Sequence, residues 1–178
     1  MKKLFPIIFL SIVLLVLLAG CVSNNQAGGL PGIGDSLESQ LYSQKCSPSN
    51  SSEKIDRLGY LEQKDDVDNE TFGFVVCKRQ NLNTGEWDVI IQSNIAVGAG
   101  LTNAQATEKT SEAQSQGQDY LKFGLPFNPL GQNDLRNIEY RLYQQNGLPA
   151  KIELFVVLRN SDRTAKQPKI LSVNWPSQ

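Results

Sequence analysis

Four acidic side chains form the cluster with the clearest capacity for chemistry in the chain: Asp65, Asp66, Asp68 and Glu70. Carboxylate oxygens are the ligands that calcium prefers, and the alternate spacing of Asp66, Asp68 and Glu70 matches the start of an EF-hand loop. The match then ends, because Thr71 stands where that loop needs glycine and Cys77 stands where it needs a bidentate glutamate. We therefore expect a solvated acidic loop before a strand, and cation binding by this cluster stays open.

The same carboxylates could act as general acid and general base in glycoside hydrolysis, which makes an envelope hydrolase an alternative function.

The composition of the chain limits other catalytic chemistry. The chain contains no histidine, which excludes Ser-His and Cys-His nucleophile pairs and imidazole metal ligands. Structural zinc lacks the four nitrogen or sulfur ligands that it normally uses. We predict no catalytic residue, no metal and no cofactor, and we do not expect an enzyme.

The first cysteine of the chain follows an apolar run and two small residues. Lys2 and Lys3 precede the run from Ile7 to Leu18, and this order of charged, apolar and small residues is typical of an export signal. A membrane-spanning helix would need about 20 apolar residues. The motif Leu18-Ala19-Gly20-Cys21 resembles the lipobox of prokaryotic lipoproteins. That resemblance implies cleavage before Cys21, whose sulfur receives a diacylglyceryl group.

By this resemblance the protein is held at a membrane through lipidated Cys21, with its folded part on the extracytoplasmic side. One acyl chain such as palmitate binds a bilayer marginally, whereas two chains hold stably. Val22 stands where an aspartate would favour inner-membrane retention in Gram-negative lipoproteins. The cell membrane and the outer membrane, and a bacterial or archaeal source, stay open.

Two further cysteines, Cys46 and Cys77, remain once Cys21 is lipidated. An even pair in an exported chain, whose surroundings are usually oxidising, predicts a disulfide between them. Two free buried thiols are the alternative.

The 178 residues divide by composition into three segments. Residues 1–20 are the expected signal peptide, residues 21–34 are the lipidated cysteine with a Gly-, Asn- and Pro-rich flexible tether, and residues 35–178 are a single globular domain. The chain holds 17 basic and 18 acidic residues. No basic face is indicated, so nucleic acid is not an expected partner.

Two short helices are expected at the start of this domain. The first begins with Asp35 and Glu38, which resemble a capping box, and ends near residue 45. A second helix is indicated by the spacing of Ile55, Leu58 and Leu61.

Alternating apolar residues predict two hairpins and a last strand. The first hairpin turns at Asn83-Thr84-Gly85, the second turns at Asn146-Gly147, and the last strand runs from Ile170 to Trp175. Between the hairpins, Thr102 and Gln105 form a capping box that starts a helix. The predicted fold class is α+β, with about five mainly antiparallel strands in two hairpins plus the last strand, and two or three helices packed on the sheet.

An apolar loop is expected between that helix and the second hairpin. It carries Leu125, Phe127 and Leu130 among prolines and glycines. Such a loop either closes one end of the core or forms an exposed contact surface. We name these three residues as a possible contact loop.

Taken together, these patterns indicate a lipid-anchored extracytoplasmic module that binds a protein or another ligand at the membrane surface. An envelope protein is the possible partner, of unknown identity. The alternatives are the hydrolase with paired carboxylates and a purely structural envelope component.

Overall fold

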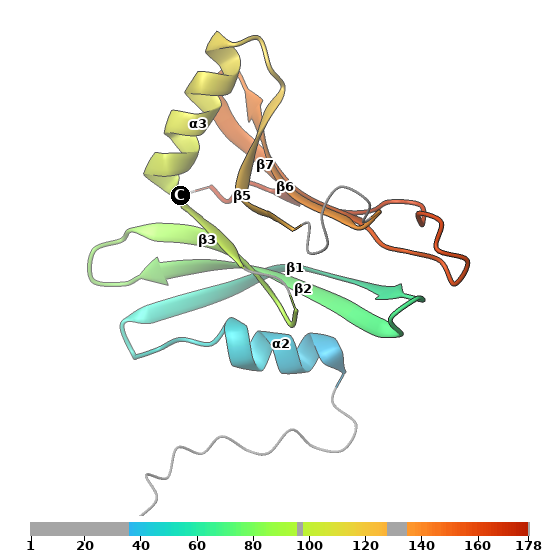
Figure 1. Cartoon of the computed structure of the whole chain (residues 1–178). Coiled ribbons are helices and arrows are strands. Elements are labelled where there is room, and N and C mark those ends of the chain that lie inside the picture. Colours follow the sequence, from blue (N-terminus) through green and yellow to red (C-terminus); the bar gives the residue numbers. More distant parts are fainter. Residues whose placement is uncertain (1–35, 96–97, 128–134, 178) are drawn as a thin grey trace, which may run out of the picture. The chain divides into compact units, whose positions relative to one another are not determined.

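In the computed structural model, residues 36–95, 98–127 and 135–177 are described, and they all belong to one compact unit of residues 33–178. Their strands form two four-stranded antiparallel sheets, which we call sheet A and sheet B (Figure 1). Each sheet is a meander that follows one helix in the chain. The order of a helix and four strands therefore occurs twice.

Sheet A and its helix occupy the first half of the described chain. Their bounds are α2 (Leu37–Lys45), β1 (Glu53–Asp65), β2 (Glu70–Asn81), β3 (Trp87–Ser93) and β4 (Ala99–Thr102). The helix α2 packs on one face of this sheet, chiefly against β2 (Figure 1).

Sheet B and its helix follow directly. Their bounds are α3 (Asn103–Ser115), β5 (Tyr120–Phe127), β6 (Asn137–Gln145), β7 (Leu148–Val157) and β8 (Lys169–Asn174). The helix α3 packs mainly against β6 and β7.

The α+β class with antiparallel strands is confirmed, but the predicted number of about five strands is wrong. The described residues contain eight strands and the two helices α2 and α3. The additional strands are β1, β4 and β5. The strand β1 holds the residues predicted to form the second helix, and β5 includes residues of the predicted apolar loop.

The second helix predicted from Ile55, Leu58 and Leu61 is wrong, because these residues lie in β1. The pairing of β1 with β2 shifts register between Arg57 and Gly59, which leaves Leu58 as an extra residue in a bulge. Ile55 packs beneath α2, whereas Leu58 and Leu61 pack in the core between the sheets. The three-residue spacing thus comes from a bulged strand.

Both predicted hairpins are confirmed. The first joins β2 to β3 with Gly85 at a φ of 74°, and the second joins β6 to β7 with Asn146 and Gly147 at φ values of 54° and 77°. Positive φ at two successive residues is the conformation that an Asn-Gly hairpin turn requires. The last strand is β8, which begins at Lys169 and ends at Asn174.

The helix starts follow their capping residues. Ser36 caps α2 and accepts a hydrogen bond from the Ser39 backbone, so the cap lies one residue after the predicted Asp35. The capping box of Thr102 and Gln105 at the start of α3 is confirmed.

Most of the core lies between the two sheets. Apolar side chains of β2 and β3, such as Phe74 and Ile91, form one buried cluster with those of β6 and β7, such as Leu142 and Leu154. The Ala106 side chain of α3 is buried in the same cluster. The buried side chains of α3, Ala106, Thr110 and Ala113, are small and allow this helix to approach the sheet closely.

The predicted disulfide is confirmed: Cys46, at the end of α2, is bonded to Cys77 in β2. It belongs to a second buried cluster with Leu41, Tyr42 and Val75 beneath α2. A loop of 31 residues closed by such a bond is worth roughly 3 to 4 kcal/mol on the chain-entropy model. The bond therefore fastens α2 to sheet A.

Among the described residues, neither helix has the length and apolar character that crossing a bilayer requires.

Candidate functional site

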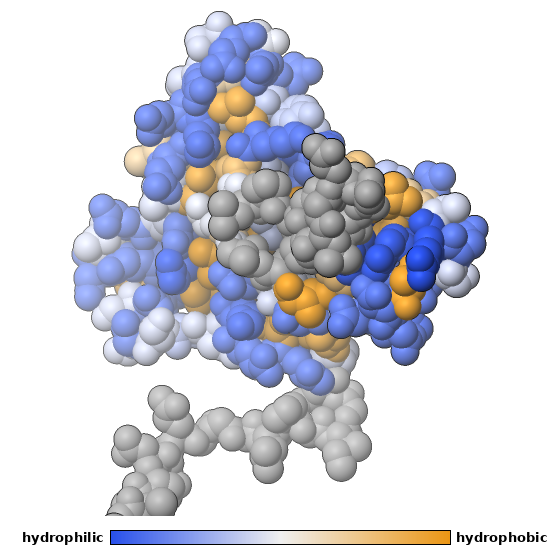
Figure 2. All heavy atoms as spheres, in the orientation of Figure 1, coloured by the Kyte–Doolittle hydropathy of each residue, from blue (hydrophilic) through white to orange (hydrophobic). Residues whose placement is uncertain are grey.

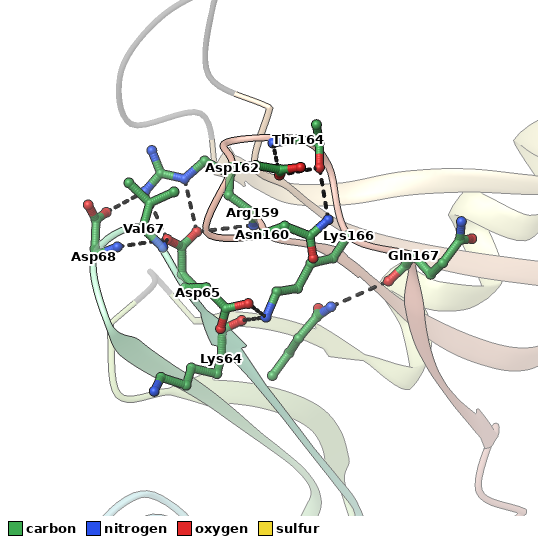
Figure 3. Close-up of polar contacts among 12 residues, drawn as sticks. Lys64, Asp65, Val67, Asp68, Arg159, Asn160, Asp162, Thr164, Lys166 and Gln167 are labelled. Carbon is green, nitrogen blue, oxygen red and sulfur yellow. Dashed lines mark hydrogen bonds and ion pairs between the residues drawn. The ribbon is translucent and has the colours of Figure 1, made fainter.

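The acidic cluster lies where β1 ends and β2 begins, and its centre is buried. Asp65 is 0% exposed and faces Arg159, which follows β7 (Figure 3). The Arg159 guanidinium donates hydrogen bonds from Nε and Nη2 to the two Asp65 carboxylate oxygens, each at 3.0 Å. The Asp65 carboxylate also accepts hydrogen bonds from the backbone N–H groups of Val67, Asp68 and Arg159.

These contacts hold Asp65 in its ionised form. Burial by itself would raise the pKa of the Asp65 carboxyl, but the hydrogen bonds from Arg159 and from the Asp68 backbone outweigh it and lower that pKa. The hydrogen bonds that Arg159 donates to Asp65 in turn raise the pKa of Arg159. A carboxyl with a lowered pKa is a poor general acid at neutral pH.

The other acids of the cluster are paired to different degrees. Asp68 contacts the guanidinium groups of both Arg136 and Arg159, and Asp66 lies 2.7 Å from Lys166 Nζ. Glu70 is exposed at the start of β2. The predicted solvated loop is therefore wrong for Asp65, because basic residues distant in sequence fold over it.

Nothing in this arrangement supports a cation site. Within the part of the chain that the structure describes, no group of three or more acidic or cysteine side chains converges as metal ligands. Three of the four carboxylates that the hydrolase alternative would use, Asp65, Asp66 and Asp68, instead form ion pairs with Arg159, Lys166 and Arg136.

The segment of residues 158–169 also covers the edge of β1. We call the contact between residues 62–68 and residues 158–169 the seam. Lys166 and Lys169 donate hydrogen bonds from their ammonium groups to the backbone carbonyls of Lys64 and Glu62, at 2.6 and 2.9 Å. Lysine side chains that occupy the carbonyls of an edge strand block its pairing with another chain. The seam therefore has a structural role and joins sheet A to sheet B.

The remaining predicted site residues lie partly outside the described structure. Cys21 and Leu130 are outside the described residues. Leu125 and Phe127 belong to β5, whose backbone pairs with β6. The predicted loop is thus a strand at this point, and its role as a contact surface stays a prediction.

A groove of about 760 Å³ opens at the end of sheet A beside the start of α3. Its lining comes from the first residue of β1, the β2–β3 hairpin and the β4–α3 junction. The lining residues are Glu53, Arg79, Asn81, Thr84, Gly85, Glu86, Trp87, Asp88, Thr102, Asn103 and Ala104. The surface over the β2–β3 turn, at the left of Figure 2, is largely hydrophilic. The size falls in the range of ligand-binding pockets, about 300–1,000 Å³.

One wall of the groove is a fixed ion pair. Arg79 of β2 stands directly opposite Asp88 of β3, and its Nε and Nη2 atoms donate to the two Asp88 oxygens at 3.1 and 2.6 Å. These hydrogen bonds raise the pKa of Arg79. Nearby, the Glu53 carboxylate accepts a hydrogen bond from the Ser49 backbone N–H, which lowers the pKa of Glu53.

The β2–β3 turn that forms the rim is held by its own side chains. The Asn81 side-chain oxygen accepts from the backbone N–H groups of Asn83 and Thr84. The Thr84 hydroxyl accepts from the Glu86 backbone and donates to the Glu86 carboxylate at 3.4 Å. A rim fixed in this way presents Glu86 with little freedom to be lost on binding.

Trp87, which lines the groove, is joined to the segment that follows β8. Trp87 packs against Trp175, with ring centroids 5.4 Å apart, and Trp175 Nε1 donates to the Asn103 side-chain oxygen. The Lys78 ammonium lies over the Trp87 ring at 4.6 Å. The groove is therefore built on packed elements of the fold.

The sequence reasoning missed this groove, although a signal for one wall was present. A hairpin that turns at Asn83-Thr84-Gly85 places Arg79 opposite Asp88, and opposite charges directly across two strands attract each other. Glu53 and Ala104 enter the groove only through the tertiary fold, for which the sequence holds no local signal.

The lining of the groove presents carboxylate, guanidinium, hydroxyl and amide groups. We compared the chain with models of protein families, with characterised proteins and with solved structures, and no match was found.

Proposed function

We propose that this protein is a lipid-anchored extracytoplasmic binding module, and that the groove beside α3 is its binding site. The groove carries the proposal, because its volume of about 760 Å³ lies in the range of ligand-binding sites and its polar side chains are held in fixed positions. The motif Leu18-Ala19-Gly20-Cys21 supports the anchor.

The proposed anchor and groove act together through effective concentration. Two acyl chains on Cys21 hold the chain stably at a bilayer. The Gly-, Asn- and Pro-rich composition of residues 22–34 supports their proposed role as a tether between the anchor and the domain. Confinement of the domain to the membrane surface raises the concentration that a neighbour at the same membrane experiences.

The disulfide supports a location outside the cytosol. Cys46 and Cys77 are bonded, and structural disulfides persist in oxidising compartments.

The anchor is tested by the change Cys21→Ser, with Ser23→Ala as the control that leaves the motif intact. We expect the unchanged chain and the control in the membrane fraction, and the Cys21 variant in the soluble extracytoplasmic fraction or with its leader still attached. Equal membrane retention of all three proteins would overturn the anchor. The mass of the intact protein provides a second measurement, because lipidation adds the mass of the acyl groups to residue 21.

The groove is tested by photo-crosslinking in cells, with the reactive amino acid placed at Thr84 on the rim. A matched position is Glu108, which is exposed on α3. We expect a discrete adduct from position 84 that is absent from position 108. Identical adducts from both positions, or none, would contradict the groove as the binding site.

A further inference from the structure

We propose that the groove receives a lysine- or arginine-bearing peptide segment of a protein partner. This inference rests on the proposed function, because it assigns a ligand class to the same groove. It is carried by the match between the charges that the groove leaves unpaired and the charge of such a segment.

The described lining residues contain three carboxylates and one guanidinium. Arg79 and Asp88 neutralise each other through two hydrogen bonds. Glu53 and Glu86 form no ion pair with another described residue, and their carboxylates accept hydrogen bonds from the Ser49 backbone N–H and the Thr84 hydroxyl. Two negative charges therefore remain for a ligand.

The cationic side chains at the groove are already engaged. Arg79 is bound by Asp88, and Lys78 lies over the Trp87 ring and donates to the Ser177 backbone carbonyl. The capping box of Thr102 and Gln105 occupies two of the backbone N–H groups at the start of α3. An anionic ligand would meet Glu53 and Glu86 without a free cationic side chain among the lining residues. Like charges oppose binding, so the geometry favours a cation.

Lysine and arginine combine a charged head with an apolar stem, and the groove offers a partner for each part. Glu53 and Glu86 face the head, and Trp87 and Ala104 supply apolar lining. The volume of about 760 Å³ is much larger than a lone ammonium needs, which favours a peptide segment over a simple amine.

The test uses the chain from residue 22 onward, with tetralysine amide, acetylated at its N-terminus, as the probe. Backbone amide shifts are followed by NMR, and the affinity is read from the titration. We expect shifts concentrated at residues 79–88 and 102–104. The paired change Glu53→Gln and Glu86→Gln should weaken binding about tenfold, since each exposed ion pair contributes up to about fivefold.

The control is the paired change Glu70→Gln and Glu108→Gln, two exposed acids that do not line the groove and that alter the net charge equally. It should weaken binding less than twofold. Equal weakening in both variants, or shifts spread over the surface, would overturn the proposal as general charge attraction.

Two further probes separate the ligand class from the groove itself. Acetylated tetraglutamate that binds the groove more tightly than tetralysine would overturn the cationic class while the groove stands. Spermidine that binds as tightly as tetralysine would overturn the peptide segment in favour of a small amine. No shift in the groove with any probe, together with no crosslink from position 84, would overturn both the ligand class and the proposed site.

Discussion

Asp65 contributes most to the fold as one half of a buried ion pair. Its carboxylate is fully buried and the Arg159 side chain is 13% exposed. Removal of one partner from such a pair leaves the other charge uncompensated, which is far more costly than the pair is favourable. The main effect of losing Asp65 is therefore a largely buried Arg159 charge without its principal partner.

The change Asp65→Asn should lower the free energy of unfolding at pH 7 by about 3 kcal/mol, because Arg159 keeps its charge and loses its buried carboxylate, with only the partly exposed Asp68 left as its ion-pair partner. Urea denaturation measures this loss. The control is Asp56→Asn, which removes an exposed ion pair with Lys54 and should cost less than about 0.5 kcal/mol. An equal loss at the two positions would refute the buried pair.

The same variant has a predictable dependence on pH. The folded state lowers the pKa of Asp65 below its ordinary value of 3.8. A carboxyl of this kind stabilises the fold fully above the unfolded pKa and loses that contribution as pH falls through the folded pKa. The difference in stability between the unchanged chain and Asp65→Asn should thus be constant from pH 7 to about 5 and shrink below about pH 4. A gap that widens on acidification would contradict this assignment.

At the scale of elements, turns and caps could be predicted from sequence, whereas strands with irregularities could not. Asn146-Gly147 and the capping box at Thr102 are determined by neighbouring residues, and both were found. The bulge at Leu58 gave β1 a false helical spacing. Arg159 lies 94 residues from Asp65, so the acidic cluster showed no sign of its partner.

The strand β5 was not predicted from the sequence because its pairing is also irregular. The irregularity lies at Gly124. This residue has a φ of 74° within the strand, where the pairing with β6 becomes irregular. A Cβ atom here would lie 2.8 Å from Ala99 Cβ and from Tyr140 Cδ2. Only glycine combines this backbone angle with such close neighbours.

The change Gly124→Ala should therefore destabilise the protein by about 2 kcal/mol or more, through backbone strain and overpacking. Thermal melts of the two proteins measure the difference. Gly100→Ala in β4 serves as the control, because its Cβ would meet Ile90 at an ordinary 3.5 Å. A melting temperature that falls no further for Gly124→Ala than for Gly100→Ala would show that the irregularity of β5 tolerates a side chain.

On the scale of the whole molecule, the repeated order of a helix and four strands raises the question of whether each half folds alone. The two helices are used differently. The helix α2 covers one face of sheet A with its own buried cluster, while α3 shares the core that lies between the sheets. Sheet B thus buries its apolar side chains in a cluster that includes side chains of sheet A. The seam and the Trp87–Trp175 contact join the halves at further points.

A core shared by both sheets predicts one cooperative unfolding transition. Tryptophan fluorescence, which reports Trp87 and Trp175, and far-ultraviolet circular dichroism should give the same urea midpoint. Leu154→Ala, which removes a fully buried side chain of β7, should lower stability by about 2 to 5 kcal/mol. Because Leu154 belongs to the buried cluster that also contains side chains of sheet A, both signals should shift together. Two separate transitions, or a shift in one signal alone, would mean that the halves are independent units joined by the seam.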